Sequence, residues 1–135
     1  MARTVTLAPL LSASPVIQVH AFAAMTALGL GTVQLAAPKG TLPHRTIGWI
    51  WYALMIVICV SAFFINEIRL WGPFSPIHLL AILTLIMVPI GVAHARQDAD
   101  RHRRAMISVF FGALVIAGAF TLLPGRIMHA VVFGP

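Results

Sequence analysis

The sequence has few charged residues, and very few of these are acidic. Of its 135 residues 9% are charged, with 3 Asp or Glu against 9 Lys or Arg. Water-soluble domains carry about 25% charged residues, so this chain cannot cover a soluble surface with charge. The composition fits a membrane bundle instead, in which only two thin caps face water. The length fits one domain.

Other features are also scarce or missing. Cys59 is the only cysteine, which excludes an internal disulfide, and no Cys-x-x-Cys-His occurs that would attach c-type haem. No charged residue falls deep inside an apolar run, which argues against an ion-coupled transporter built on buried acids. No nucleophile triad, phosphate loop or metalloprotease signature is present. The basic excess lies in short links between apolar runs, which favours a lipid bilayer over nucleic acid as the partner.

What the sequence does contain is a set of long charge-free apolar runs, at 16–37, 47–65, 77–95 and 105–123. About 20 helical residues cross the hydrocarbon core, and a segment in lipid must satisfy its own backbone hydrogen bonds. The sequence therefore predicts an all-α membrane protein with four transmembrane helices. Short links make neighbours antiparallel, as an up-down-up-down bundle. Residues 1–15 are predicted to be a short, uncleaved and poorly ordered leader, and 16–135 the four-helix transmembrane domain.

Basic residues are unevenly shared between the two ends of the predicted bundle. The side with the first and third links, counted with their flanks, carries Lys39, Arg45, Arg96, Arg101, Arg103 and Arg104. The other side carries Arg3, Arg69 and Arg126. The positive-inside rule assigns the richer side to the cytoplasm. Both termini are therefore predicted to face the external side.

Histidines are the candidate chemical groups, and they fall into two layers near the helix ends. The predicted outer layer holds His20, His78 and His129, and the predicted cytoplasmic layer holds His44, His94 and His102. From His20 to His44 is 24 positions, and from His78 to His102 is again 24. This equal spacing predicts two parallel helix-hairpin repeats related by an axis along the membrane normal.

The repeat predicts how the histidines pair. His20 would face His78 in the outer layer, and His44 would face His102 in the inner layer. Two facing imidazoles suit a b-type haem, because a neutral ring nitrogen binds iron and bundle cores hold such cofactors. The layers lie roughly 24 Å apart at ~1.5 Å per residue, so two haems would carry electrons across the membrane. The arginines after the inner histidines, Arg45 and Arg103, are candidate partners of haem propionates or of a quinone.

Other interpretations of these residues stay open. Interfacial histidines often cap helices or meet lipid head groups, and Arg45, Arg103 and Arg104 have a ready role as anchors to lipid phosphate. Three histidines in a layer also permit a copper or zinc site, since imidazole suits both metals. His94 and His129 have no counterpart in the repeat and are predicted to be structural.

Several short motifs occur from His20 onward: His44-Arg45 with Gly48 and Tyr52, His78-Leu79, His102-Arg103 with Met106, and Pro124-Gly125-Arg126. By these motifs the chain resembles a family of small bacterial inner-membrane proteins of unknown function, which implies a four-helix membrane fold and supplies no catalytic residues. Its histidine layout is similar, more loosely, to di-haem cytochrome b561-like proteins and to a small four-helix assembly factor for haem-copper oxidases. Likeness of layout does not establish function.

Two hypotheses from different classes follow. The first is a haem b protein that moves electrons between a quinol pool and a respiratory-chain partner on the other side of the membrane. The second is a non-catalytic partner or assembly factor of a respiratory complex. Haem content separates them, because only the first requires a bound chromophore.

Overall fold

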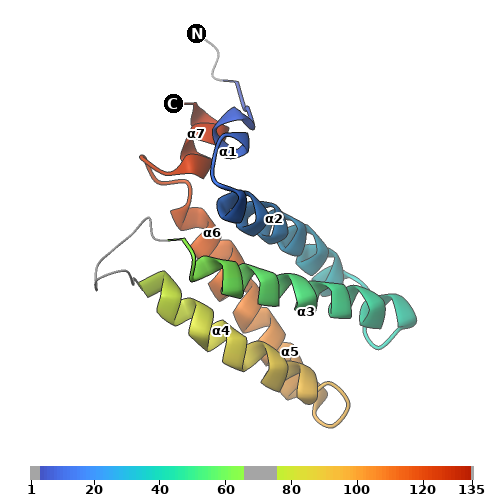
Figure 1. The fold of residues 1–135 in the computed structure, drawn as a ribbon. Coiled ribbons are helices and arrows are strands. Elements are labelled where there is room, and N and C mark those ends of the chain that lie inside the picture. Colours follow the sequence, from blue (N-terminus) through green and yellow to red (C-terminus); the bar gives the residue numbers. More distant parts are fainter. Residues whose placement is uncertain (1–3, 66–75, 135) are drawn as a thin grey trace.

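The computed structural model describes residues 4–65 and 76–134, and all regular structure in these ranges is helical. The long helices are α2 (Pro15–Ala36), α3 (Leu42–Ala62), α4 (Pro76–Ala93) and α5 (Ala99–Val109), which continues through the π-helix η1 (Phe110–Ile116) into α6 (Ala117–Phe120). Short helices α1 (Ala8–Leu11) and α7 (Ile127–Phe133) lie near the chain ends (Figure 1). Counting α5 to α6 as one, 4 helices are long and apolar enough to cross a membrane. The all-α class with four spans is confirmed.

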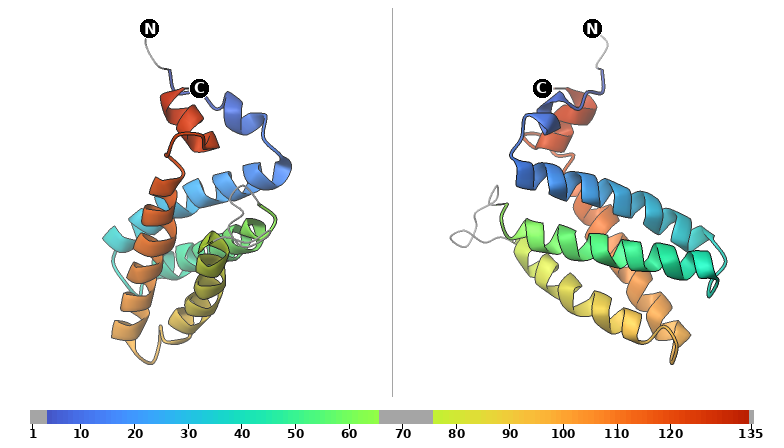
Figure 2. Two further views of the ribbon diagram at one scale, coloured as in Figure 1. Left: turned by 90° about the vertical axis from the view of Figure 1, so that its left-hand side faces the viewer. Right: turned by 45° about the vertical axis from the view of Figure 1, so that its right-hand side comes forward.

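The long helices pack mainly on their neighbours in the chain. α2 contacts α3, α3 contacts α4 and α4 contacts α5, while η1 returns to contact α2. Figure 2 shows α2, α3 and α4 as successive layers that the segment from α5 to α6 crosses. These contacts do not relate the helices to a bilayer. The alternating orientation across the membrane and the hairpin repeat therefore stay predictions.

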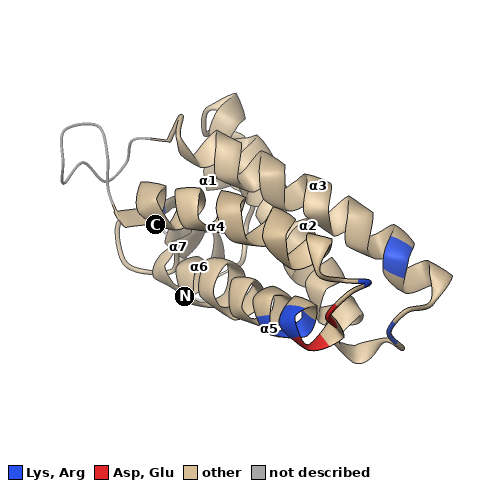
Figure 3. Cartoon of the chain, turned by 90° about the horizontal axis from the view of Figure 1, so that it is seen from below, with Lys and Arg blue, Asp and Glu red and all other residues tan. Residues whose placement is uncertain are grey.

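The two ends of the bundle differ in charge. The inner end is defined by the connections 37–41 and 94–98, and the outer end by α1 and α7. Figure 3 shows the blue and red segments gathered around the inner connections. Arg3 and Arg69, counted above for the opposite side, lie outside the described residues. The orientation of the termini across the membrane stays a prediction.

Two spans begin earlier than their apolar runs. α3 and α5 start ahead of positions 47 and 105, so they include the basic residues beside the links. Capping explains both starts. The Thr41 hydroxyl accepts a hydrogen bond from the backbone N–H of His44 (3.3 Å), and the Asp98 carboxylate accepts one from the backbone N–H of Arg101 (3.1 Å). His44 therefore lies in the first turn of α3 rather than in a loop.

The chain ends are more ordered than the sequence predicts. α1 lies within the expected leader and packs on α7, which follows the fourth span. The backbone N–H of Thr6 donates to the Val131 carbonyl (3.1 Å), and Leu10 is fully buried. The leader is therefore helical at Ala8–Leu11, where α1 packs on α7 and Leu10 is buried. The segments α1 and α7 together are called the terminal cap.

The fourth span is not a uniform α-helix. Between α5 and α6, the residues of η1 form a π-helix. Such segments are rare and frequently lie at functional sites, because they shift the side chains that follow around the helix. α4, by contrast, continues through Pro89 to Ala93.

Large apolar side chains cover the outside of the bundle. On α4, Leu83, Ile86 and Ile90 are all more than half exposed. A water-soluble protein rarely exposes a continuous surface of this kind. In a bilayer the same surface lies against lipid tails, which agrees with the membrane-spanning length of the helices.

Candidate functional site

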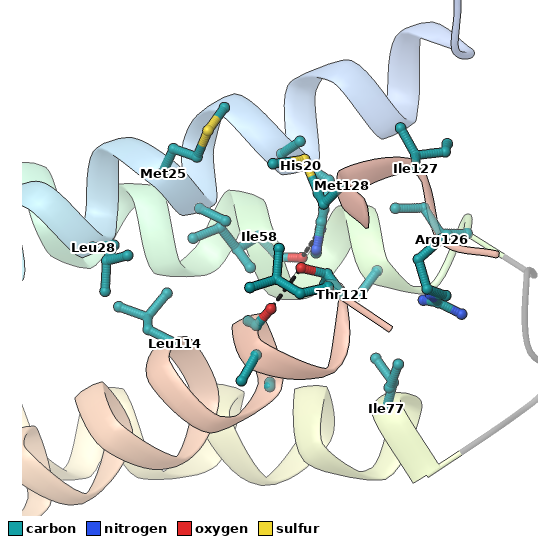
Figure 4. Close-up of a pocket in the computed structure, with 18 of the residues that line it drawn as sticks. His20, Met25, Leu28, Ile58, Ile77, Leu114, Thr121, Arg126, Ile127 and Met128 are labelled. Carbon is teal, nitrogen blue, oxygen red and sulfur yellow. Dashed lines mark hydrogen bonds between the residues drawn. The ribbon is translucent and has the colours of Figure 1, made fainter. Parts of the chain in front are cut away.

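A cavity of about 610 Å³ lies at the outer end of the bundle, between α2, α3, the η1–α6 segment and the terminal cap (Figure 4). Its volume falls in the range of about 300–1,000 Å³ that is typical of small-molecule and cofactor sites. Small residues account for much of the wall, among them Ala21, Ala24, Ala113, Ala117 and Gly118. Because these side chains are short, facing helices leave space between them. Of the described lining residues, three have polar side chains: His20, Thr121 and Arg126.

His20 is held in a defined orientation at the cavity wall. Its Nδ1 lies 3.0 Å from the carbonyl oxygen of Ile58 and 2.9 Å from Oγ of Ser61, both on α3. A carbonyl can only accept a hydrogen bond, so Nδ1 donates to Ile58 and Nε2 carries the lone pair. Histidines that bind metals are usually anchored in this way, by donation from the other ring nitrogen. His20 therefore has the tautomer and support of a ligand.

Thr121 and Arg126 differ in what they offer the cavity. The Thr121 hydroxyl donates to the carbonyl of Gly118. The side chain of Arg126 has no carboxylate partner within the described ranges, where the one ion pair joins Arg101 to Asp98 (3.3 Å) at the inner end. Arg126 therefore brings a positive charge to the outer cavity.

His78 lies at the same end of the bundle but not on the cavity wall. It is 3% exposed, and its ring packs against that of Phe63 with centroids 5.8 Å apart. The preceding residue, Ile77, does line the cavity. His20 and His78 both lie beside the last turns of α3. The structure therefore brings the outer pair to one end of the bundle without directing both rings into one cavity.

His44 and His102 also lie near one another. The side-chain amide of Gln34 donates to the backbone carbonyl of His44 (2.8 Å), and Nδ1 of His102 donates to that of Gly91 (2.9 Å). His44 lies within electrostatic range of His102. Neither the outer cavity nor a smaller one of about 150 Å³ between α4 and the fourth span is lined by these two residues. The inner pair therefore shares one end of the bundle, and neither histidine lines either of these two cavities.

The remaining candidates lie apart from the cavity. Arg45 and Arg103 are exposed at the inner end. His129 donates from Nδ1 to the carbonyl of Leu122 (2.7 Å) and stacks near Phe133, which agrees with a structural role.

The three-histidine metal site is not formed. Over residues 4–65 and 76–134, no three His, Cys, Asp or Glu side chains come close enough to hold a metal ion. The histidines of each layer share an end of the bundle but do not converge in the described arrangement, and the copper or zinc site stays a prediction.

Two residues of this site were missed by sequence reasoning. Ser61 lies inside an apolar run. The available signal was its hydroxyl group, which lies on the helix next to the one that carries His20. Arg126 was counted only as a topology signal, although it is the last residue of the Pro124-Gly125-Arg126 motif. Neither role is visible without knowing which helices meet.

One family model, described as predicted membrane protein (DUF2306), matches residues 17–133. No curated protein and no solved structure matches the chain. The match covers the four long helices almost completely and includes His20 and Arg126. Its description agrees with the membrane-spanning helices and assigns no chemistry.

Proposed function

We propose that this chain, which belongs to the DUF2306 family of predicted membrane proteins, binds haem b in the outer cavity through His20 and transfers electrons. The observation that supports this best is the anchored His20 ring on the wall of a cavity of about 610 Å³. A neutral imidazole with its Nε2 lone pair available is the usual axial ligand of haem iron.

The residues around the cavity fit the remaining needs of such a cofactor. Apolar side chains from three helices and the terminal cap make up most of the wall, so a flat macrocycle would be held largely by burial. Haem supplies one-electron redox chemistry when bound. The protein's part is to fix the ring nitrogen of His20 at one depth, through Ser61 and Ile58, and to exclude water.

His78 is the proposed second ligand. It is the other histidine beside the end of α3, and a haem with two histidine ligands would draw one from each hairpin. Its ring packs against Phe63, so coordination requires the ring to turn toward the cavity. His78 therefore has to change its ring orientation to bind iron, whereas His20 already lies on the cavity wall.

The setting of this function is also proposed. The protein lies in a bacterial inner membrane with both termini external, and it takes electrons from quinol for a respiratory-chain partner. A second haem between His44 and His102, with Arg45 and Arg103 near its propionates, would complete a path across the membrane. The placement of both histidines at the inner end supports that pair, and neither lines the outer cavity or the smaller one.

Haem content of the purified protein tests the proposal. Protein made with sufficient haem should show reduced-minus-oxidised bands, and His20→Ala should lower bound haem at least about tenfold, since an anchored ligand is lost. His129→Ala is the matched control, because His129 also donates from Nδ1 to a carbonyl at the outer end but does not line the cavity.

The stoichiometry and the spectrum decide the finer points. One haem per chain that survives the double substitution of His44 and His102 by Ala limits the protein to the outer site. Two haems, one lost in that variant, establish the inner pair. A change from six-coordinate to five-coordinate iron in His78→Ala identifies the second ligand. Colourless wild-type protein contradicts the proposal, and the partner or assembly-factor hypothesis then takes its place.

A further inference from the structure

Among the described residues that line the outer cavity, Arg126 alone has a charged side chain. It follows Gly125, whose φ of 85° is accessible to glycine at little cost and turns the chain from the fourth span into α7. Figure 4 shows the Arg126 side chain beside Ile77 at one end of the cavity, with Leu28 and Leu114 at the other. The cavity is thus charged at one end and apolar along its length.

No protein carboxylate in the described ranges neutralises this charge. The described acids, Asp98 and Asp100, belong to the start of α5 at the inner end, where Asp98 pairs with Arg101. A guanidinium next to apolar walls is costly unless an anion or another set of acceptors pairs with it. Its planar donors match a carboxylate or a phosphate.

The shape of the site limits what can carry that anion. Ala24, Ala113 and Gly118 leave an apolar space that a small inorganic ion would not fill. An added methyl group at Gly118 would meet nothing within 4 Å, so the space beside the helix is open there. A ligand that satisfies both ends has an apolar body and an acidic group.

We infer that the outer cavity binds an amphiphile with a carboxylate or phosphate group, which Arg126 holds while the apolar body lies between α2 and the η1–α6 segment. This inference concerns the same cavity as the proposed function but does not depend on iron. A haem would meet it through its propionates, and an acidic lipid through its head group.

Metal-free protoporphyrin and its dimethyl ester test the carboxylate arm, because neither contains iron. Fluorescence titration of the detergent-purified full chain should show the diacid bound about tenfold more tightly than the diester, as expected for one charge-assisted contact. Arg126→Gln should abolish this preference, and Arg126→Lys should retain part of it. Arg96→Gln is the matched control, because Arg96 is exposed at the inner end. Gly118→Leu should weaken the binding of both porphyrins, because the leucine side chain fills the space beside the helix.

Phosphatidic acid and phosphatidylcholine with the same acyl chains test the phosphate arm, in competition against a fluorescent fatty acid. Preference for phosphatidic acid that disappears in Arg126→Gln and weakens in Gly118→Leu supports the inference even if porphyrins do not bind. The haem proposal is decided separately, by the haem content of the wild-type protein. The inference is overturned if Arg126→Gln leaves every preference unchanged, if the diacid binds like the diester and phosphatidic acid binds like phosphatidylcholine, or if no probe binds. If the protein fails these tests but still binds haem, the inference about Arg126 is wrong and the proposed function is unaffected.

Discussion

The inner half of the bundle is closely packed, whereas the outer half encloses a cavity. A methyl group on Gly31 of α2 would lie 2.6 Å from Cδ2 of Phe110, and one on Gly91 of α4 would lie 2.5 Å from Cε of Met106. At the outer end, α2 and the η1–α6 segment instead face each other across about 610 Å³. Small residues occur in both halves but have opposite effects.

The difference lies in what fills the space that small residues leave. Beside Gly31, the space is taken by Phe110 and the indole of Trp51. Beside Gly118, an added methyl group would meet nothing within 4 Å, and this position lies just after the η1 segment. A small residue in a membrane helix therefore allows either close contact or a binding site, depending on the facing side chain.

The largest effect in this comparison is expected from adding a methyl group at the close contact between Gly31 and Phe110 in the inner half. Gly31→Ala should lower the free energy of unfolding by about 1–3 kcal/mol, because the ring of Phe110 is 6% exposed and has little room to move. Denaturation by SDS in mixed micelles measures it. Gly29→Ala is the control, since a methyl group there meets nothing within 4 Å. Equal destabilisation by both substitutions would mean that the inner half is not tightly packed.

A smaller effect is expected at the cavity wall. Ser61→Ala removes one of the two groups that hold Nδ1 of His20 and should weaken haem binding about tenfold, with little change in protein stability. Haem titration of the apoprotein gives the affinity. Ser14→Ala provides the comparison, because Ser14 is exposed and makes no capping hydrogen bond with its side chain. Unchanged affinity in Ser61→Ala would show that Ile58 alone orients the ring.

The smallest effect is expected at the boundary between the two halves. Trp51 donates from Nε1 to the carbonyl of Ala27 (3.1 Å) in the buried core. Trp51→Phe should cost about 1 kcal/mol, since the carbonyl remains within a helix and is not left without a donor. The same SDS titration applies, with Trp49→Phe as the control because Trp49 is 62% exposed. A loss as large as that of Gly31→Ala would make this hydrogen bond, rather than close packing, the main tie between α2 and α3.

Much of the fold was predictable, and the helix ends show where prediction stopped. Apolar runs identified the four spans because each one must satisfy its backbone hydrogen bonds within itself. The early starts of α3 and α5 depended on the Thr41 and Asp98 caps, which extend helices into polar sequence. The order of the terminal cap depended on α1 packing on α7, a contact between two elements that lie far apart in the sequence.

For the candidate site, the sequence by itself determined that the chain is a membrane protein and which histidines lie near each end of the bundle. Helix length and residue spacing fix the approximate depth of each residue. Only the tertiary structure decided that His20 lines a cavity, that His78 packs on Phe63 and that Arg126 shares the wall with His20. Spacing along a chain gives the depth of a residue, whereas its facing partner depends on how each helix is rotated. That rotation is set by packing between helices, such as the contact of Gly31 with Phe110, the first residue of the π-helical segment.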